Sequence, residues 1–228
     1  MTPSADGAAD PRGGAVSGAP ASGYDRAVAA VRGGADPAGA AADLLAGLTD
    51  DELLGLLDGD EPFWPGMPHM MGKGYNLEPI VAGALPRIGL PGIRFSDGPR
   101  GAVIGRSTAF PVPMGRGATW DPALEERVGE AIGAEIRAQG GNLFAGVCIN
   151  LLRHPAWGRA QETYGEEPAL LGEMGAALAR GAQRHVMACV KHYACNSMEN
   201  ARFSVDVEVD ERALHEVYLP HFRAVVEA

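Results

Sequence analysis

Two segments of the chain combine helix signals at their ends with apolar residues at every third or fourth position. In the first, an Asp-Pro pair at 121–122 supplies an N-cap and a first-turn proline, and the apolar period runs up to a glycine pair at 140–141. In the second, Pro168 opens a similar pattern that reaches about Arg184. Both segments are therefore predicted to be amphipathic helices.

Short apolar runs lie between and around these helices. Residues 142–149 and 186–190 are apolar almost throughout, as in strands buried on both faces, and a strand-like piece at 92–96 precedes the first helix. Alternating apolar and polar residues over 203–209 predict a further, half-exposed strand, and Asp210 then caps a final helix. This order predicts an α/β fold in which helices cover parallel strands.

The beginning of the chain is poor in large apolar side chains. Residues 1–38 are mostly Ala, Gly, Pro, Ser and Asp, which predicts a flexible low-complexity leader, because so little apolar surface does not offset the entropy of ordering. Order is expected from about Leu44. The sequence TDDE at 49–52 is a capping-box pattern that opens a short leucine-rich helix ending at Gly59. Residues 61–106 are rich in Gly and Pro and are expected to be mostly loop.

The composition is that of an ordinary protein with a hydrophobic core, and it argues against several partners. Of 228 residues, 46% are hydrophobic and 21% are charged, and the formal net charge of -10 leaves no broad cationic surface for nucleic acid or anionic lipid. The clean apolar stretches are far shorter than the roughly 20 residues that cross a bilayer, and the N-terminus has no signal-peptide pattern. We expect a cytoplasmic protein with reduced cysteines and with no nucleic-acid or membrane partner.

Polar residues follow three predicted strands at the points where the strands end. Residues 96–101, 153–168 and 191–192 bring carboxylates, arginines, a Lys-His pair and two aromatic rings. In a parallel sheet these ends share the edge where chemistry gathers. Mixed charge beside aromatic faces suits a neutral polyhydroxylated ligand, because carboxylates accept from hydroxyls and Arg and Lys donate to them. A surface loop held by internal ion pairs explains residues 153–168 equally well.

Metal and cofactor chemistry have less support. The spacing of His185, Cys189, His192 and Cys195 resembles that of zinc ligands, but Cys189 lies inside a predicted strand and would face away from a shared centre. The sequence has no glycine-rich dinucleotide or phosphate loop and no GxSxG elbow. We expect no cofactor and no metal, with a zinc-binding fold around Cys189, His192 and Cys195 as an alternative.

Five short segments together resemble one protein family. They are SDGPRG at 96–101, ATWD at 118–121, residues 150–168 with their WGR and ETYGEEP sequences, KHY at 191–193 and DERAL at 210–214. In this order and spacing they resemble the N-terminal domain of glycoside hydrolase family 3, the β-glucosidase-like enzymes, from about Gly89 to the C-terminus. The resemblance implies a (β/α)8 TIM-type barrel, incomplete here, with residues 39–228 supplying about the first five β/α units.

The resemblance also implies an activity and a set of substrate-binding residues. Family members hydrolyse β-linked glycosides with retention of configuration, and the substrate implied for the parent of this chain is a β-linked glucoside or a related oligosaccharide, cut at the non-reducing end. The positions implied to bind the hydroxyls of the terminal sugar are Asp97, Arg159, Lys191, His192 and Arg202. Asp97 can accept from two neighbouring hydroxyls, and the other four supply donors. Arg159 is equally suited to act as an internal strut for Glu162 or Glu166.

The family's catalytic pair is not expected in this chain. Retaining glycosidases use a nucleophile and a general acid about 5–5.5 Å apart. In family 3 the nucleophile lies in a Ser-Asp-Trp-like segment on a later barrel strand and the acid lies in the following domain, whereas this chain stops at Ala228. We therefore expect no catalytic residue here, no turnover by the chain alone, and a partner in the missing C-terminal part of the same protein. The alternative is a non-catalytic carbohydrate-binding or regulatory protein.

Overall fold

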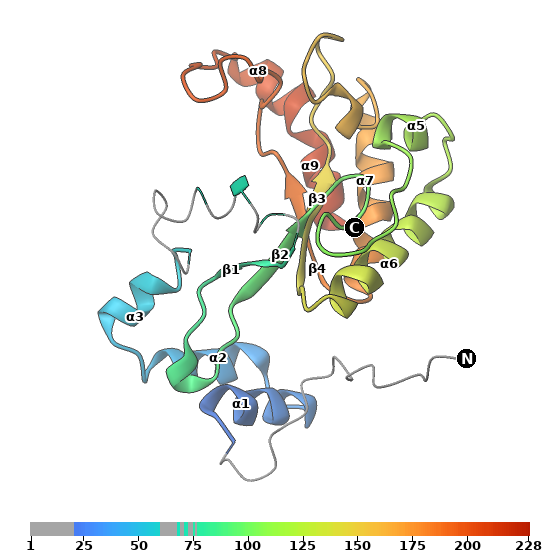
Figure 1. Cartoon of the computed structure of the whole chain (residues 1–228). Coiled ribbons are helices and arrows are strands. Elements are labelled where there is room, and N and C mark those ends of the chain that lie inside the picture. The colour runs from blue at the N-terminus through green and yellow to red at the C-terminus, as the bar shows by residue number, and fades with distance from the viewer. Residues whose placement is uncertain (1–20, 60–67, 69–70, 73–74, 76) are drawn as a thin grey trace, which may run out of the picture. The chain divides into compact units, whose positions relative to one another are not determined.

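The elements of the protein fall into two units. The computed structural model describes residues 21–59, 68, 71–72, 75 and 77–228. Unit 1 contains Met1–Gly66 and Val81–Ile93, and unit 2 contains Met67–Ile80 and Arg94–Ala228. Figure 1 labels their helices and strands. No helix among the described residues is long and apolar enough to cross a membrane.

Unit 1 is built from short helices with side-chain caps. They are α1 (Gly23–Arg32), α2 (Pro37–Leu45), α3 (Asp50–Gly55) and the 3-10 turn η2 (Pro86–Ile88). Ser22 and Asp25 form a capping box at α1, and Asp36 caps α2. Thr49 and Glu52 form the predicted capping box at α3, which confirms the start of that helix, whereas its predicted end at Gly59 is wrong, because α3 ends at Gly55.

The predicted flexible leader is wrong from residue 23 onward. α1 and the beginning of α2 lie within residues 1–38, so the prediction that order begins near Leu44 is wrong as well. Few large apolar side chains are needed here, because alanine favours the helix and the caps satisfy the first backbone N–H groups. The rest of the predicted leader, residues 1–20, lies outside the described residues.

A four-stranded sheet has the strand order β1-β2-β3-β4. Its strands are β1 (Ile80–Ala82), β2 (Ile93–Asp97), β3 (Leu143–Cys148) and β4 (Met187–Lys191). β2 pairs with β3 and β3 pairs with β4, both in parallel, which confirms the predicted arrangement. β1 and η2 lie in the stretch predicted to be mostly loop, and part of that stretch lies outside the described residues.

Helices connect and follow the parallel strands of unit 2. They are α5 (Pro113–Gly117), α6 (Pro122–Ala138), the 3-10 turn η3 (Ala160–Glu162), α7 (Pro168–Gln183), α8 (Glu211–Ala213), the π-helical turn η4 (Leu214–Tyr218) and α9 (Pro220–Glu227). Asp121 caps α6 and Pro168 begins α7, as predicted. α7 packs on α6, β3, β4 and α9, which makes it the central helix of unit 2 (Figure 1).

Glycines set how closely α6 and α7 approach each other. A β-carbon added at Gly129 would lie 2.3 Å from the carbonyl oxygen of Leu178, and one added at Gly181 would lie 2.0 Å from that of Glu126. Neither position has room for an alanine, so the two helix backbones are in direct contact. The apolar core around this contact includes Ile132, Ile136, Phe144, Val147, Leu171, Met174 and Leu178.

The strand predicted over 203–209 is wrong. These residues are all described and form no strand, and Phe203 is 98% exposed. The backbone N–H groups of Ser204 and Val205 donate to the carbonyl of Ala201 instead of to a neighbouring strand. An alternating pattern yields a stable strand only where a partner strand accepts its hydrogen bonds, and the pattern alone does not supply one.

The predicted final helix is present but interrupted. The carboxylate of Asp210 accepts from the backbone N–H of Ala213 at 2.9 Å and caps α8. The N–H of Leu219 then donates to the carbonyl of Leu214, five residues earlier, and α9 begins at Pro220. Because Pro220 has no N–H, a regular helix cannot run through this position.

A buried ion pair ties the loop after β2 to the helices. The guanidinium of Arg116 donates to both carboxylate oxygens of Glu125, at 2.8 and 2.9 Å, and both side chains are nearly inaccessible to solvent. The hydroxyl of Tyr164 donates to the same carboxylate at 2.5 Å. Arg116 also donates to the carbonyls of Pro99, at 3.0 Å, and Pro111. This network holds the chain next to the end of β2.

We expect Arg116→Met to destabilise the protein by about 3–5 kcal/mol, because it leaves the buried Glu125 carboxylate without its cation. Urea unfolding at pH 7 measures the change. The matched control is Arg212→Met, which breaks an exposed i,i+4 pair with Glu216 and is expected to cost at most about 1 kcal/mol. Equal losses in the two variants would contradict the structural role of the buried pair.

Candidate functional site

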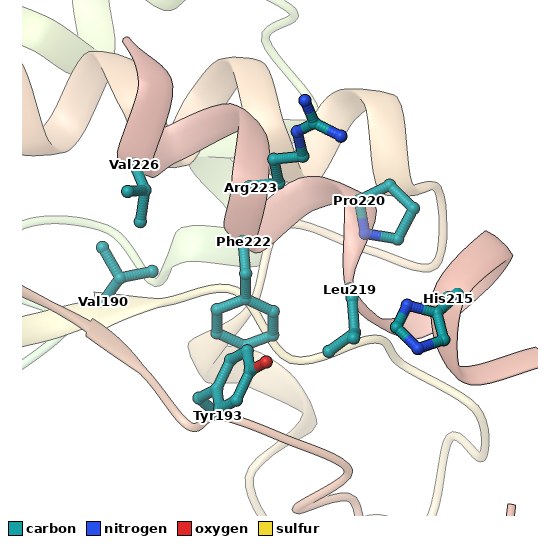
Figure 2. Close-up of a pocket in the computed structure, with 8 residues that line it drawn as sticks. All are labelled: Val190, Tyr193, His215, Leu219, Pro220, Phe222, Arg223 and Val226. Atoms are coloured by element: carbon teal, nitrogen blue, oxygen red, sulfur yellow. The ribbon is translucent and has the colours of Figure 1, made fainter. Parts of the chain in front are cut away.

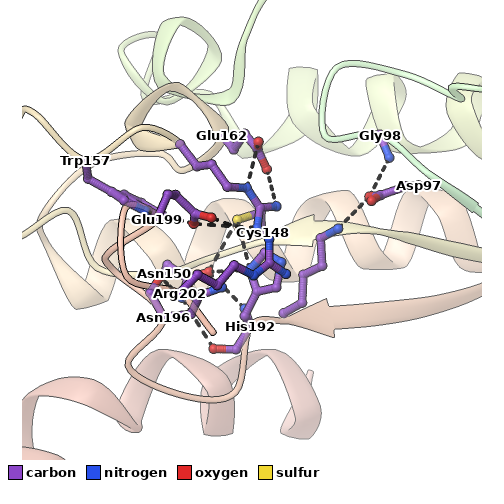
Figure 3. A network of polar contacts seen from close by, with 12 residues as sticks. Asp97, Gly98, Cys148, Asn150, Trp157, Glu162, His192, Asn196, Glu199 and Arg202 are labelled. Atoms are coloured by element: carbon purple, nitrogen blue, oxygen red, sulfur yellow. Dashed lines mark hydrogen bonds and ion pairs between the residues drawn. The ribbon is translucent and has the colours of Figure 1, made fainter. Parts of the chain in front are cut away.

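The carboxyl ends of β2, β3 and β4 bring polar side chains to one edge of the sheet. Asp97 is the last residue of β2, Lys191 is the last residue of β4, and Asn150 follows β3 by two residues. Because the strands are parallel, their carboxyl ends lie together although the residues are far apart in sequence. Figure 3 shows the polar network that results.

Asp97 and Lys191 form the ion pair at one end of this network. The ammonium nitrogen of Lys191 lies 2.5 Å from Oδ1 of Asp97, and the backbone N–H of Gly98 donates to the same oxygen at 2.8 Å. The hydroxyl of Tyr75 donates to Oδ2 at 2.8 Å. Burial alone would raise the pKa of Asp97, but Lys191 and these donors outweigh it and hold the pKa below its usual value. Asp97 is therefore a carboxylate at neutral pH.

Asn150 fixes the backbone and the ring of His192. Its Oδ1 lies 2.8 Å from Nδ1 of His192 and accepts from the backbone N–H of the same residue at 2.9 Å. Its Nδ2 donates to the carbonyls of His192 and Asn196, at 3.3 and 3.0 Å. Because an amide oxygen only accepts, Nδ1 carries the proton and Nε2 is left as an acceptor. Burial, and then the positive charges of Arg159 and Lys191, lower the pKa of His192 to about 3.

Arg159 binds Glu162 through two hydrogen bonds. Nε and Nη2 of the guanidinium lie 2.9 and 2.7 Å from the two carboxylate oxygens. Glu199 lies on the other side of the network: it accepts from Nε1 of Trp157 at 3.2 Å and from Arg202 at 3.4 Å, and it lies 3.9 Å from Nη1 of Arg159. The internal strut to Glu162 is therefore present, and Glu199 links the two arginines.

All five residues predicted to bind sugar belong to this one network. Asp97 contacts Lys191, Arg159 and Arg202 share Glu199, and charges of the other four all act on His192. The network brings them together, while their role toward a sugar stays a prediction.

The network also contains Tyr75, Asn150 and Glu199, which were not among the predicted site residues. Asn150 directly follows a predicted strand, so its position was a usable signal. Tyr75 and Glu199 lie in segments with no strand or helix pattern, and only the folded chain brings them to the network.

The described residues provide no group of three or more His, Cys, Asp or Glu side chains arranged to hold a metal ion. Cys189, part of the zinc alternative, lies within β4, and Nδ1 of His192 is committed to Asn150. Cys148 is buried next to His192, with 3.8 Å between Sγ and Nδ1. Burial, and then the charge of Glu162, raise the pKa of this thiol to about 11, so it is neutral.

A separate apolar hollow lies beside β4 and α9. Its volume is about 590 Å³, and Figure 2 shows the side chains that line it. Val190 and Tyr193 come from β4 and the residues after it, and Phe222 and Val226 come from α9. The ring of Tyr193 meets that of Phe222 edge-on, with 5.3 Å between the centroids. The polar network and this hollow are lined by different residues.

Residues 80–228 match the family description "Glycosyl hydrolase family 3 N terminal domain". The chain belongs to glycosyl hydrolase family 3. The "Beta-glucosidase" of Rhizobium radiobacter is 35% identical over 193 residues, which cover 81% of this chain and 22% of the relative. "Beta-glucosidase BoGH3A" of Bacteroides ovatus is 39% identical over 157 residues, covering 62% of this chain and 21% of that protein. The chain thus spans about a fifth of the length of these curated relatives.

Solved β-glucosidase structures share the α/β fold of this chain. β-Glucosidase 3B from Thermotoga neapolitana, in complex with glucose, is 35% identical with a TM-score of 0.74, over 81% of this chain and 27% of the other. DesR, a β-glucosidase from Streptomyces venezuelae in complex with D-glucose, is 31% identical with a TM-score of 0.69, over 82% of this chain and 23% of the other.

The ring of His192 is expected to stay neutral between pH 7 and pH 5, with its proton on Nδ1. Nitrogen-15 NMR of the folded chain measures both the tautomer and the titration. An unfolded histidine titrates at about pH 6.5. Since the folded ring takes up its proton only near pH 3, the unfolded state binds more protons in between, and His192 reduces stability as the pH falls from about 6.5 toward 3. A ring that titrates above pH 6 in the folded chain would contradict the buried, Asn150-bound geometry.

Proposed function

We propose that this chain forms the sugar-binding wall of a retaining β-glucosidase that acts at the non-reducing end of β-linked glucosides. The observation that carries the proposal is the network at the carboxyl ends of β2, β3 and β4, where Asp97, Lys191 and His192 lie together in a family 3 chain. Relatives named as β-glucosidases and structures solved with glucose support the substrate class.

In this proposal the role of each residue follows from the hydrogen-bond donors and acceptors of its side chain. Asp97 accepts from sugar hydroxyls, because it is a carboxylate at neutral pH. Lys191, Arg159 and Arg202 donate to hydroxyl oxygens through protons that their carboxylate partners leave free. His192 accepts a hydroxyl proton at Nε2, since its Nδ1 proton is used by Asn150. A neutral ring suits a neutral ligand, because it adds no further charge to desolvate.

We propose further that residues 39–228 are part of a (β/α)8 barrel. The support is the run of parallel strands β2, β3 and β4 joined by helical connections, which is the repeating unit of that fold. The apolar hollow of about 590 Å³ beside β4 and α9 is the surface on which the next β/α unit, from the C-terminal part of the same protein, packs.

The catalytic carboxylates are proposed to come from that remaining part. The carboxylates of the network are already engaged: Asp97 by Lys191, Glu162 by Arg159, and Glu199 by Trp157 and Arg202. A nucleophile and a general acid need one ionised and one protonated carboxyl group facing the glycosidic bond. Three carboxylates neutralised by fixed cations suit binding better than proton transfer.

The first test measures the binding of methyl β-D-glucoside to the chain by NMR titration. We expect Asp97→Ala to weaken binding by about 10- to 100-fold, because it removes a charged acceptor from the site. Asp206→Ala, which removes a carboxylate from an exposed position outside the network, is the matched control and is expected to leave the affinity unchanged. Unchanged affinity in Asp97→Ala, or no binding by the wild-type chain, would contradict the proposal.

The second test is turnover. We expect the chain alone to release no nitrophenol from 4-nitrophenyl β-D-glucoside, since it is proposed to lack the catalytic pair. The same assay on the parent protein is expected to show hydrolysis. Turnover by this chain would overturn the assignment of the carboxylates, and a parent protein that binds glucoside without hydrolysing it would favour a non-catalytic carbohydrate-binding protein.

A further inference from the structure

The hydroxyl of Thr163 joins two parts of the polar network through Asn150. It donates to the backbone carbonyl of Asn150 at 2.6 Å, and Thr163 and Asn150 are only 0% and 2% exposed. The side-chain amide of Asn150 binds both the backbone and the ring of His192 (Figure 3). A single residue therefore connects Thr163 to His192.

Thr163 also ends the turn that carries Arg159 and Glu162. Arg159 is the N-cap of η3, Glu162 is its last residue, and Thr163 is its C-cap. The N–H of Glu162 donates to the carbonyl of Arg159 at 2.9 Å, and the two side chains form the ion pair described above. The turn and its ion pair are thus one compact piece, and the hydroxyl of Thr163 fastens the end of that piece to Asn150.

The place of this turn depends on bonds to the rest of the fold. A three-residue 3-10 turn has poor hydrogen-bond geometry and little stability of its own. Before the turn, Nε1 of Trp157 donates to Glu199 at 3.2 Å. After it, the hydroxyl of Tyr164 donates to Glu125 and so holds the chain to α6. The bond of Thr163 differs from that of Tyr164, because it leads to the sugar-binding residues and not to the helices.

We propose that Thr163 is a positioning residue of the sugar site: its hydroxyl sets the distance between the donors of Arg159 and the ring of His192. This inference rests on the proposed function. A sugar held from both sides is bound well only when the two sides are correctly spaced, since a displacement of about 1 Å is enough to break a hydrogen bond.

The test uses two variants and a matched control. Thr163→Val keeps the shape of the side chain and removes the hydroxyl, and Thr163→Ser keeps the hydroxyl. The control is Thr119→Val, because the hydroxyl of Thr119 also donates to a backbone carbonyl, that of Arg116, at 2.6 Å, but outside the polar network. NMR titration with methyl β-D-glucoside gives the affinity. The indole N–H resonance of Trp157 reports its bond to Glu199 without a ligand.

Thr163→Val is expected to bind the glucoside about three- to tenfold more weakly and to shift the Trp157 resonance, because the buried carbonyl loses its donor and the turn moves. Thr163→Ser is expected to stay within about twofold of the wild type, with the Trp157 resonance unmoved, and Thr119→Val is expected to keep the wild-type affinity. If Thr163→Val does not fold, Thr163→Ala takes its place with the same expected result.

Wild-type affinity in the variant without the hydroxyl, even if its thermal stability falls, would show a purely structural bond and overturn the inference alone. An equal loss of affinity in Thr119→Val would overturn it as well, because a general loss of stability would then explain the effect. Failure of the wild-type chain to bind glucoside would instead overturn the proposed function and the inference with it.

Discussion

Parallel pairing of β2, β3 and β4 is the constraint from which the site follows. Parallel strands cannot be joined by tight turns, so each must be followed by a helical crossover, and all their carboxyl ends point the same way. The side chains at these ends then share one edge, whatever their distance in sequence. Asp97 and Lys191 are 94 residues apart and in contact for this reason.

The negative and positive charges at this edge of the sheet balance one another. The network contains three carboxylates, on Asp97, Glu162 and Glu199, and three cations, on Lys191, Arg159 and Arg202. The whole chain carries a net charge of -10, so this local balance is a property of the site and not of the composition. A balanced, partly buried network offers many fixed donors and acceptors without a strong field, which fits an uncharged ligand better than an anion or a cation.

Sequence reasoning succeeded where a local rule decides the structure. α6 and α7 have a cap or first-turn proline and a regular apolar period, and β3 and β4 are apolar runs between them. It failed where contacts with a distant part of the chain decide the structure. The alternation over 203–209 has no neighbouring strand. Sequence reasoning also overlooked one local rule, the capping box of Ser22 and Asp25 that begins α1. Tyr75 reaches Asp97 through tertiary structure alone, so no spacing rule could have indicated it.

Cys148 has a consequence for chemical labelling of the site. Its thiol is 1% exposed and lies beside His192, and a pKa of about 11 leaves roughly one molecule in ten thousand as thiolate at pH 7. Alkylating reagents attack the thiolate, so this cysteine is shielded both by access and by protonation. Reaction of Cys148 with a maleimide would therefore require the strand edge to open. The rate of that reaction would measure how often the edge opens.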